Sequence, residues 1–270
     1  MRYYLKDGLQ LARRQSFAIG VMFLFQFFWS MLFYQFIQDH VVSVMKRFPP
    51  QQLAIERVDL FLNESALLLF ETELAQPFLW TLLFFILARF VISPFITAGV
   101  YDSLHSEGPR GTIFIQGMKR LSAFFTILFW LRSLLTAIPL YWLIPVAMQR
   151  ITYADSYLSL ALGLMPILLG MMVYSSLLKL IFIYIQLAKT TNTRLLMALL
   201  ISFRHFLPIC GLALIVFSVA AAFGLLVFTS SLYWAGFLAL VIYLVYPLLQ
   251  LALEVWGISV QYRFWQEKRL

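Results

Sequence analysis

The sequence predicts an all-α, polytopic membrane protein with six transmembrane helices arranged as three hairpins. Hydrophobic residues make up 62% of the 270 residues, charged residues only 12%, and the mean hydropathy is +0.87. So few charges cannot solvate the surface of a soluble domain of this length, which excludes soluble enzymes and disordered chains. Six apolar runs are long enough to cross a bilayer as helices. Within each run, apolar residues do not alternate with polar ones, which argues against the strands of a β-barrel.

The first predicted span covers residues 17–37. This run is longer than the apolar core of a signal peptide, and no small-residue cleavage site follows it, so we expect it to remain as a membrane helix. A basic amphipathic stretch, Leu9–Phe17, precedes it and contains Arg13 and Arg14. We expect a short helix at the membrane interface, with apolar residues toward the acyl chains and arginines toward the headgroups.

A long loop, residues 38–77, separates the first span from the second, 78–100. The loop contains a break at Phe48-Pro49-Pro50. Leucines then mix with acidic residues from Gln51 to Glu73, which predicts one or two short surface helices. We interpret them as a cap over the bundle, because surface helices with apolar faces usually pack on their own protein. A partner-binding or gating element is the alternative.

The remaining spans are predicted over 121–148, 157–187, 206–230 and 234–260, and we expect all six to form one domain. Basic amphipathic stretches also lead into the third and fifth spans: one contains Lys119 and Arg120, the other Arg204. Aligning Arg14, Arg120 and Arg204 predicts a two-span unit repeated three times, each unit preceded by an interfacial helix. Anionic lipid or a cytoplasmic partner would be the natural ligand of such helices.

The 20 Lys and Arg residues indicate the orientation. Thirteen lie in the N-terminal segment, in the loops after the second and fourth spans, and in the C-terminal tail. Four lie in the connections on the other side, and three lie within spans. Because Lys and Arg are enriched in cytoplasmic loops, we expect both termini in the cytoplasm. The net charge of +8 is therefore explained by the membrane surface, and no nucleic-acid partner is expected.

Polar residues inside the spans form the candidate site. Ionisable groups in a membrane are costly, and those that occur there commonly serve function. The candidates are the charged Arg89, Arg132, Lys179 and Glu254, with Gln26 and Gln250 as further hydrogen-bonding groups. They could form a network that fixes helix packing, with Lys179 reaching toward the cytoplasm. They could instead form a cationic site for an anionic group such as a lipid phosphate.

No cofactor or metal is expected. The sequence contains no phosphate-binding Walker loop, no zinc-protease motif and no nucleophile elbow. The three histidines, His40, His105 and His205, fall in different loops, and Cys210 is the only cysteine. The sequence therefore predicts a protein that is not an enzyme.

A resemblance is carried by Pro94–Tyr101 at the end of the second span, by Gly108–Gly111, and by the amphipathic stretch Ile115–Phe124. These segments resemble bacterial six-span families that include the membrane domain attached to some glycerophosphodiester phosphodiesterases and the YciC-like inner-membrane proteins. The resemblance implies a protein of the bacterial cytoplasmic membrane. The soluble catalytic barrel of those phosphodiesterases is absent from this sequence, so their activity is not implied.

Three functions are compatible with these observations. We expect a non-enzymatic accessory or scaffold protein of the bacterial cell envelope, which binds anionic lipid or a membrane or cytoplasmic protein. One alternative is a permease-type subunit that works with a separate ATPase, and a co-purifying ATPase would favour it. The other is a membrane enzyme that acts on lipid headgroups.

Overall fold

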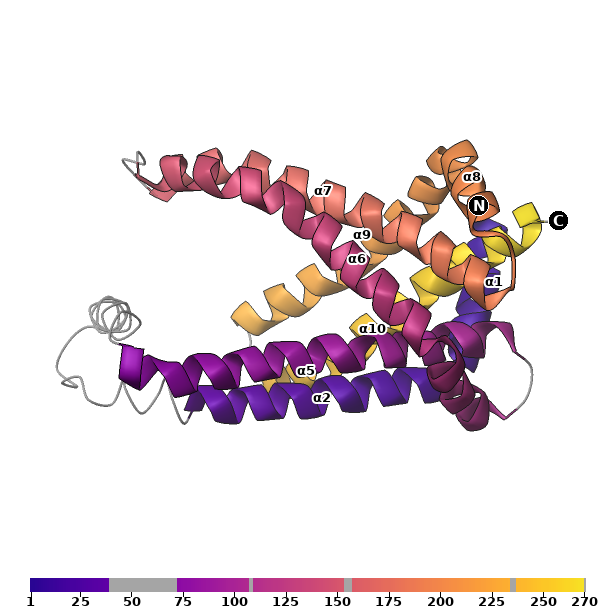
Figure 1. Cartoon of the computed structure of the whole chain (residues 1–270), viewed down its shortest axis with the longest axis horizontal. Coiled ribbons are helices and arrows are strands. Elements are labelled where there is room, and N and C mark those ends of the chain that lie inside the picture. Colours follow the sequence, from indigo (N-terminus) through magenta and orange to yellow (C-terminus); the bar gives the residue numbers. More distant parts are fainter. Residues whose placement is uncertain (39–71, 107–108, 153–156, 234–236, 270) are drawn as a thin grey trace. The chain divides into compact units, whose positions relative to one another are not determined.

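The computed structural model describes residues 1–38, 72–106, 109–152, 157–233 and 237–269. These residues form eight helices and no strand, which confirms the predicted all-α class (Figure 1). Six of the helices are long and apolar enough to cross a membrane, so the chain is a multi-pass integral membrane protein. The helices are α1 (Arg2–Arg14), α2 (Ser16–Ile37), α5 (Thr72–His105), α6 (Arg110–Thr152), α7 (Tyr157–Thr190), α8 (Leu195–Arg204), α9 (Phe206–Tyr233) and α10 (Phe237–Arg269).

The chain divides into two compact units. The smaller unit, Val21–Ser93, contains most of α2 and the first part of α5. These two helices pack through aromatic rings: Phe85 lies 5.7 Å, between ring centroids, from both Trp29 and Phe36. The larger unit consists of Met1–Gly20 and Pro94–Leu270. The expectation of one domain over the whole chain stays a prediction.

Helix bounds differ from the predicted spans mainly where helices continue into polar sequence. The amphipathic stretch before the third span is not a separate helix, because α6 begins at Arg110 and runs on through it. Similarly, α10 continues beyond residue 260 to Arg269. The predicted surface helices of loop 38–77 fall almost entirely within residues 39–71, outside the described residues.

The core of the larger unit lies at the end that carries both termini. Its buried side chains come from the last turns of α5, α7 and α10 and from the first turns of α6 and α9; they include Tyr101, Leu121, Phe125, Tyr184, Leu187, Ile209, Leu212, Val260 and Trp265. The far halves of α6, α7 and α9 expose apolar side chains instead. Lipid tails are as apolar as leucine, so the hydrophobic effect drives burial mainly where water reaches the protein.

Two short helices precede spans in the way the sequence predicts. Helices α1 and α8 both end at an arginine, Arg14 and Arg204, and a single residue separates each from the following long helix. The two connecting residues have similar backbone angles: φ −94° and ψ 26° at Gln15, and φ −110° and ψ 30° at His205. The arginines are aligned in the proposed repeat, whereas the third aligned residue, Arg120, lies inside α6.

Candidate functional site

Two of the predicted intramembrane charges form an ion pair. The Nζ atom of Lys179 on α7 lies 2.7 Å from Oε1 of Glu254 on α10. Both side chains are partly exposed, so the pair lies at the surface of the larger unit. Helices α7 and α10 pack against each other, which brings together residues that are far apart in the sequence. The pair neutralises both charges within the span region, where water is scarce.

Arg132 on α6 lies close to this pair. It is within electrostatic range of Glu254 and of Tyr101, a buried residue near the end of α5. The Arg132 side chain is half-buried. Its guanidinium makes no hydrogen bond or ion pair with any residue that the structure describes, whereas its backbone carbonyl accepts a bond from Thr136. The structure thus pairs Lys179 with Glu254 and places Arg132 within electrostatic range of that glutamate.

The other predicted polar residues are placed differently. Gln250 is exposed and lies one helical turn before Glu254 on α10. Arg89 and Gln26 belong to the smaller unit, in which Arg89 is exposed and Gln26 is half-buried.

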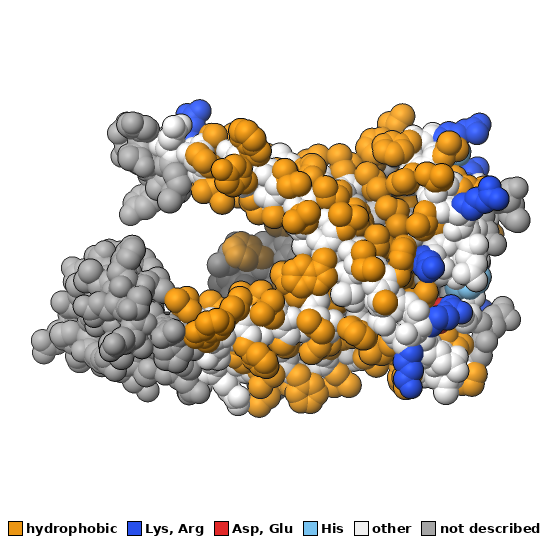
Figure 2. Space-filling view, in the orientation of Figure 1, with side chains coloured by type: hydrophobic (Ala, Val, Ile, Leu, Met, Phe, Trp, Pro, Cys, Tyr) orange, Lys and Arg blue, Asp and Glu red, His pale blue; other side chains and the backbone are white. Residues whose placement is uncertain are grey.

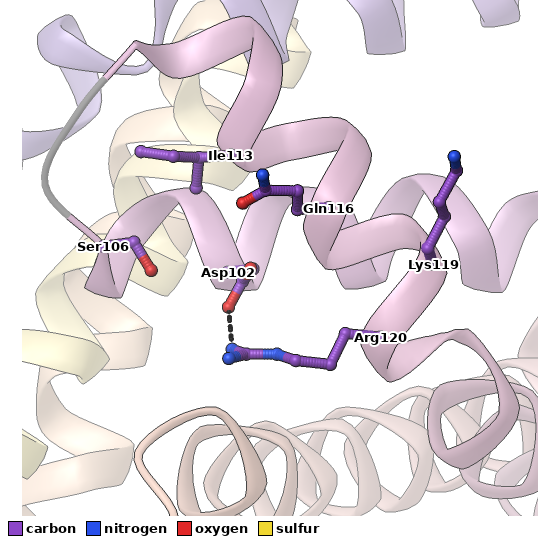
Figure 3. A pocket seen from close by; sticks show the side chains of 6 residues that line it. All are labelled: Asp102, Ser106, Ile113, Gln116, Lys119 and Arg120. Atoms are coloured by element: carbon purple, nitrogen blue, oxygen red, sulfur yellow. Dashed lines mark hydrogen bonds and ion pairs between the residues drawn. The ribbon is translucent and has the colours of Figure 1, made fainter.

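A cavity of about 580 Å³ lies between the end of α5 and the beginning of α6 (Figure 3). We call it the end cavity; it is lined by Asp102, Ser106, Ile113, Gln116, Lys119 and Arg120. Three of these residues, Gln116, Lys119 and Arg120, come from the predicted amphipathic stretch 115–124. Of the six, the sequence analysis singled out only Lys119 and Arg120 as candidate site residues.

Asp102 and Arg120 form an ion pair across the end cavity. The Asp102 side chain is only 5% exposed, whereas that of Arg120 is 59% exposed. A buried carboxylate without a partner would be costly, so Arg120 is needed at this position. The carboxylate in turn restrains the orientation of the Arg120 guanidinium, whose side chain stays largely exposed.

Gly117 allows α6 to approach Asp102 closely. A Cβ atom at this position would lie 2.4 Å from Cβ of Asp102 and 2.9 Å from its Oδ2. Any larger residue would therefore displace the carboxylate that holds Arg120. The bend between α1 and α2 is anchored beside the same site, because Nε2 of Gln15 donates a hydrogen bond of 2.7 Å to the backbone oxygen of Ser103.

The predicted interfacial basic residues are all exposed in the larger unit: Arg13, Arg14, Lys119, Arg120 and Arg204. Each lies in or near the last turn of α1 or α8, or in the first turns of α6. Figure 2 shows Lys and Arg side chains near the helix ends beside the termini, and hydrophobic side chains along the helices. This distribution suits an interface between headgroups and acyl chains.

Asp102 is the residue that sequence reasoning missed. Its signal was an acidic residue two positions after the second predicted span, followed by a basic pair directly before the third. Within the part of the chain that the structure describes, no group of three His, Cys, Asp or Glu residues could hold a metal ion.

Comparison of the chain with protein-family models, with curated proteins and with solved structures gives no match.

Proposed function

We propose that the chain is a non-enzymatic accessory or scaffold protein of the bacterial cytoplasmic membrane that binds an anionic lipid headgroup in the end cavity. Both termini then face the cytoplasm, as the distribution of Lys and Arg favours. The single observation that supports this function best is the Asp102–Arg120 pair in the lining of the end cavity. The resemblance to YciC-like proteins is part of the same proposal.

The chemistry of the end cavity suits a phosphate group. Its lining carries one negative and two positive side chains, and the hydroxyl of Ser106 and the amide of Gln116 add neutral donors. Arg120 presents a guanidinium whose orientation is already restrained, which reduces the entropy lost on binding. A volume of about 580 Å³ is sufficient for a headgroup, since ligand sites commonly measure about 300–1,000 Å³.

The position of the end cavity also favours a lipid ligand. Lys119 and Arg120 lie near the start of a helix that is long and apolar enough to span a membrane. Basic residues near an anionic leaflet each gain about 1 kcal/mol. The Asp102 carboxylate is already engaged by Arg120, which supports binding over a reaction on the headgroup.

The proposal is tested with Lys119→Gln in the full-length chain. This change keeps the Asp102–Arg120 pair, so the fold should remain intact. Loss of a charged hydrogen bond, about 1.5–3 kcal/mol, should weaken phosphatidylglycerol binding roughly tenfold or more. Binding is measured by native mass spectrometry after titration of this lipid into phosphatidylcholine nanodiscs.

Arg150→Gln is the matched control. It removes an exposed arginine from the last turn of the same helix, at the end opposite Lys119. The control should bind phosphatidylglycerol as the unmodified chain does. Equal binding by the Lys119→Gln variant and the unmodified chain, or equal losses in both variants, would show that the end cavity does not recognise the headgroup.

A further inference from the structure

The acidic side chains of the six candidate spans are already engaged. The spans contain three acids: Asp102, Glu254 and Glu267. Asp102 pairs with Arg120, Glu254 pairs with Lys179, and Glu267 accepts a hydrogen bond from Tyr4 and pairs with Lys268. The span segments of the smaller unit, Val21–Ile37 and Leu79–Ser93, contain no acid. The spans therefore leave no carboxylate for Arg132.

Arg132 cannot avoid its charge by losing a proton, because guanidinium groups stay protonated in proteins. It follows Arg120 by twelve residues on α6, which places it about 18 Å further along the helix. At that depth an arginine without a partner is costly. Arg132 and the nearby Lys179–Glu254 pair together carry one net positive charge.

We propose that Arg132 binds an anionic group, a phosphate or a carboxylate, within the membrane-spanning part of the larger unit. The half-buried side chain is accessible to such a group, and no described residue occupies its N–H donors. Lys179 is not available to bind the anionic group, since its ammonium already pairs with Glu254 at 2.7 Å. This site lies deeper than the end cavity and is carried by different residues, so it does not depend on the proposed function.

Two sources could supply the anion: the phosphate of a lipid, or a small anion from water. The full-length chain is therefore placed in phosphatidylcholine nanodiscs and titrated in one arm with phosphatidylglycerol and in the other with inorganic phosphate. Bound ligand is counted by native mass spectrometry. Arg132→Gln should lose binding about tenfold in one arm, and that arm identifies the source.

Two variants separate this site from the end cavity. Lys119→Gln should leave the Arg132-dependent binding unchanged, and Arg150→Gln serves as the control on the same helix. Unchanged binding by a folded Arg132→Gln variant in both arms would overturn the proposal.

The Glu254→Gln variant distinguishes anion binding by Arg132 from a purely structural role of Arg132. It removes the negative charge beside Arg132 and frees the ammonium of Lys179, so the local net charge rises. The anion should then bind about tenfold more tightly. Unchanged or weaker binding by this variant would overturn the proposal even if Arg132→Gln failed to fold.

Discussion

Helices α1 and α8 have corresponding positions in the sequence and both pack on protein, but they expose different outward faces. Each is short, ends at an arginine, and is joined through one residue to a spanning helix. Helix α1 packs on α10, where it buries Gly8 and Ala12 and receives a hydrogen bond from the Trp256 indole to the backbone oxygen of Leu5. Helix α8 packs on α7 and α9 and directs apolar side chains outward.

The outward face of α8 is strongly apolar. Leu196 is 80% exposed, Leu200 63% and Phe203 67%, and Leu207 at the start of α9 continues the surface at 83%. Arg194 and Arg204 flank α8 and are exposed. An apolar face between two arginines suits acyl chains with headgroups at either end.

The outward face of α1 is mostly polar. It exposes Lys6, Gln10 and Arg13, which suit water and headgroups. A short helix that ends at an arginine can therefore present either a polar or an apolar face outward. We interpret α1 as held in place by protein contacts, and α8 as held by lipid as well.

The largest expected effect tests whether protein contacts hold α1. In Gly8→Ala, the new Cβ would lie 2.5 Å from a side-chain carbon of Val260 and 2.9 Å from its backbone. Overpacking against backbone should lower the free energy of unfolding by about 1–3 kcal/mol. Thermal unfolding in detergent measures it.

Gly20→Ala is the matched control for this substitution. It is also a helical glycine, but a Cβ there has no atom within 4 Å, so the change should be neutral or slightly stabilising. Equal stability of the two variants would show that α1 is not packed tightly on α10.

The second prediction concerns the surroundings of α8. With Cys210→Ala as background, Leu200→Cys and Gln10→Cys each provide a single thiol. In lipid bilayers a membrane-impermeant maleimide should label the cysteine at 10 about tenfold faster than that at 200, because thiols among acyl chains meet little reagent. Labelling rates in denaturant correct for intrinsic reactivity, and equal rates in bilayers would place the outward face of α8 in water.

The smallest effect concerns the contact between α1 and the end of α10. Tyr4 donates a hydrogen bond of 2.7 Å to the Glu267 carboxylate, and this bond raises the pKa of Tyr4 from 10.0 to about 12. A folded-state pKa above the unfolded value means that the stabilisation is full below pH 10 and is lost as the pH rises through about 12.

Ultraviolet titration of phenolate measures this pKa. The difference between the unmodified chain and Tyr4→Phe isolates the one tyrosine, and its midpoint should lie near pH 12. A midpoint near the ordinary pKa of 10.0 would mean that α1 does not contact Glu267 in solution.

The positions of the spanning helices could be predicted, because a chain in lipid must satisfy its backbone hydrogen bonds within each helix. The ends of the helices were harder to predict from the sequence. Residues 110–120 and 261–269 fall outside the predicted spans, yet they are helical. In the second segment, Tyr262, Phe264 and Trp265 are buried against other helices. A hydropathy profile that looks for membrane spans does not reveal such packing.

The candidate site residues could likewise be predicted only in part from the sequence. Arg132, Lys179 and Glu254 could be chosen from the sequence because charge is rare in apolar spans. Which basic residue pairs with Glu254 depends on the packing of α7 and α10. Asp102 lay at the edge of an apolar run, and nothing in its local sequence indicated that α6 would approach at Gly117 and bury it.

Hydropathy and run length along the chain are enough to predict that it crosses the membrane as helices. Which charges are neutralised depends on the tertiary structure, because the packing of the helices sets the distance between paired groups. The tertiary structure also set which side chains of α1 and α8 are covered. Both helices end at an arginine in the sequence, whereas the packing of the neighbouring helices leaves a mostly polar face of α1 and an apolar face of α8 exposed.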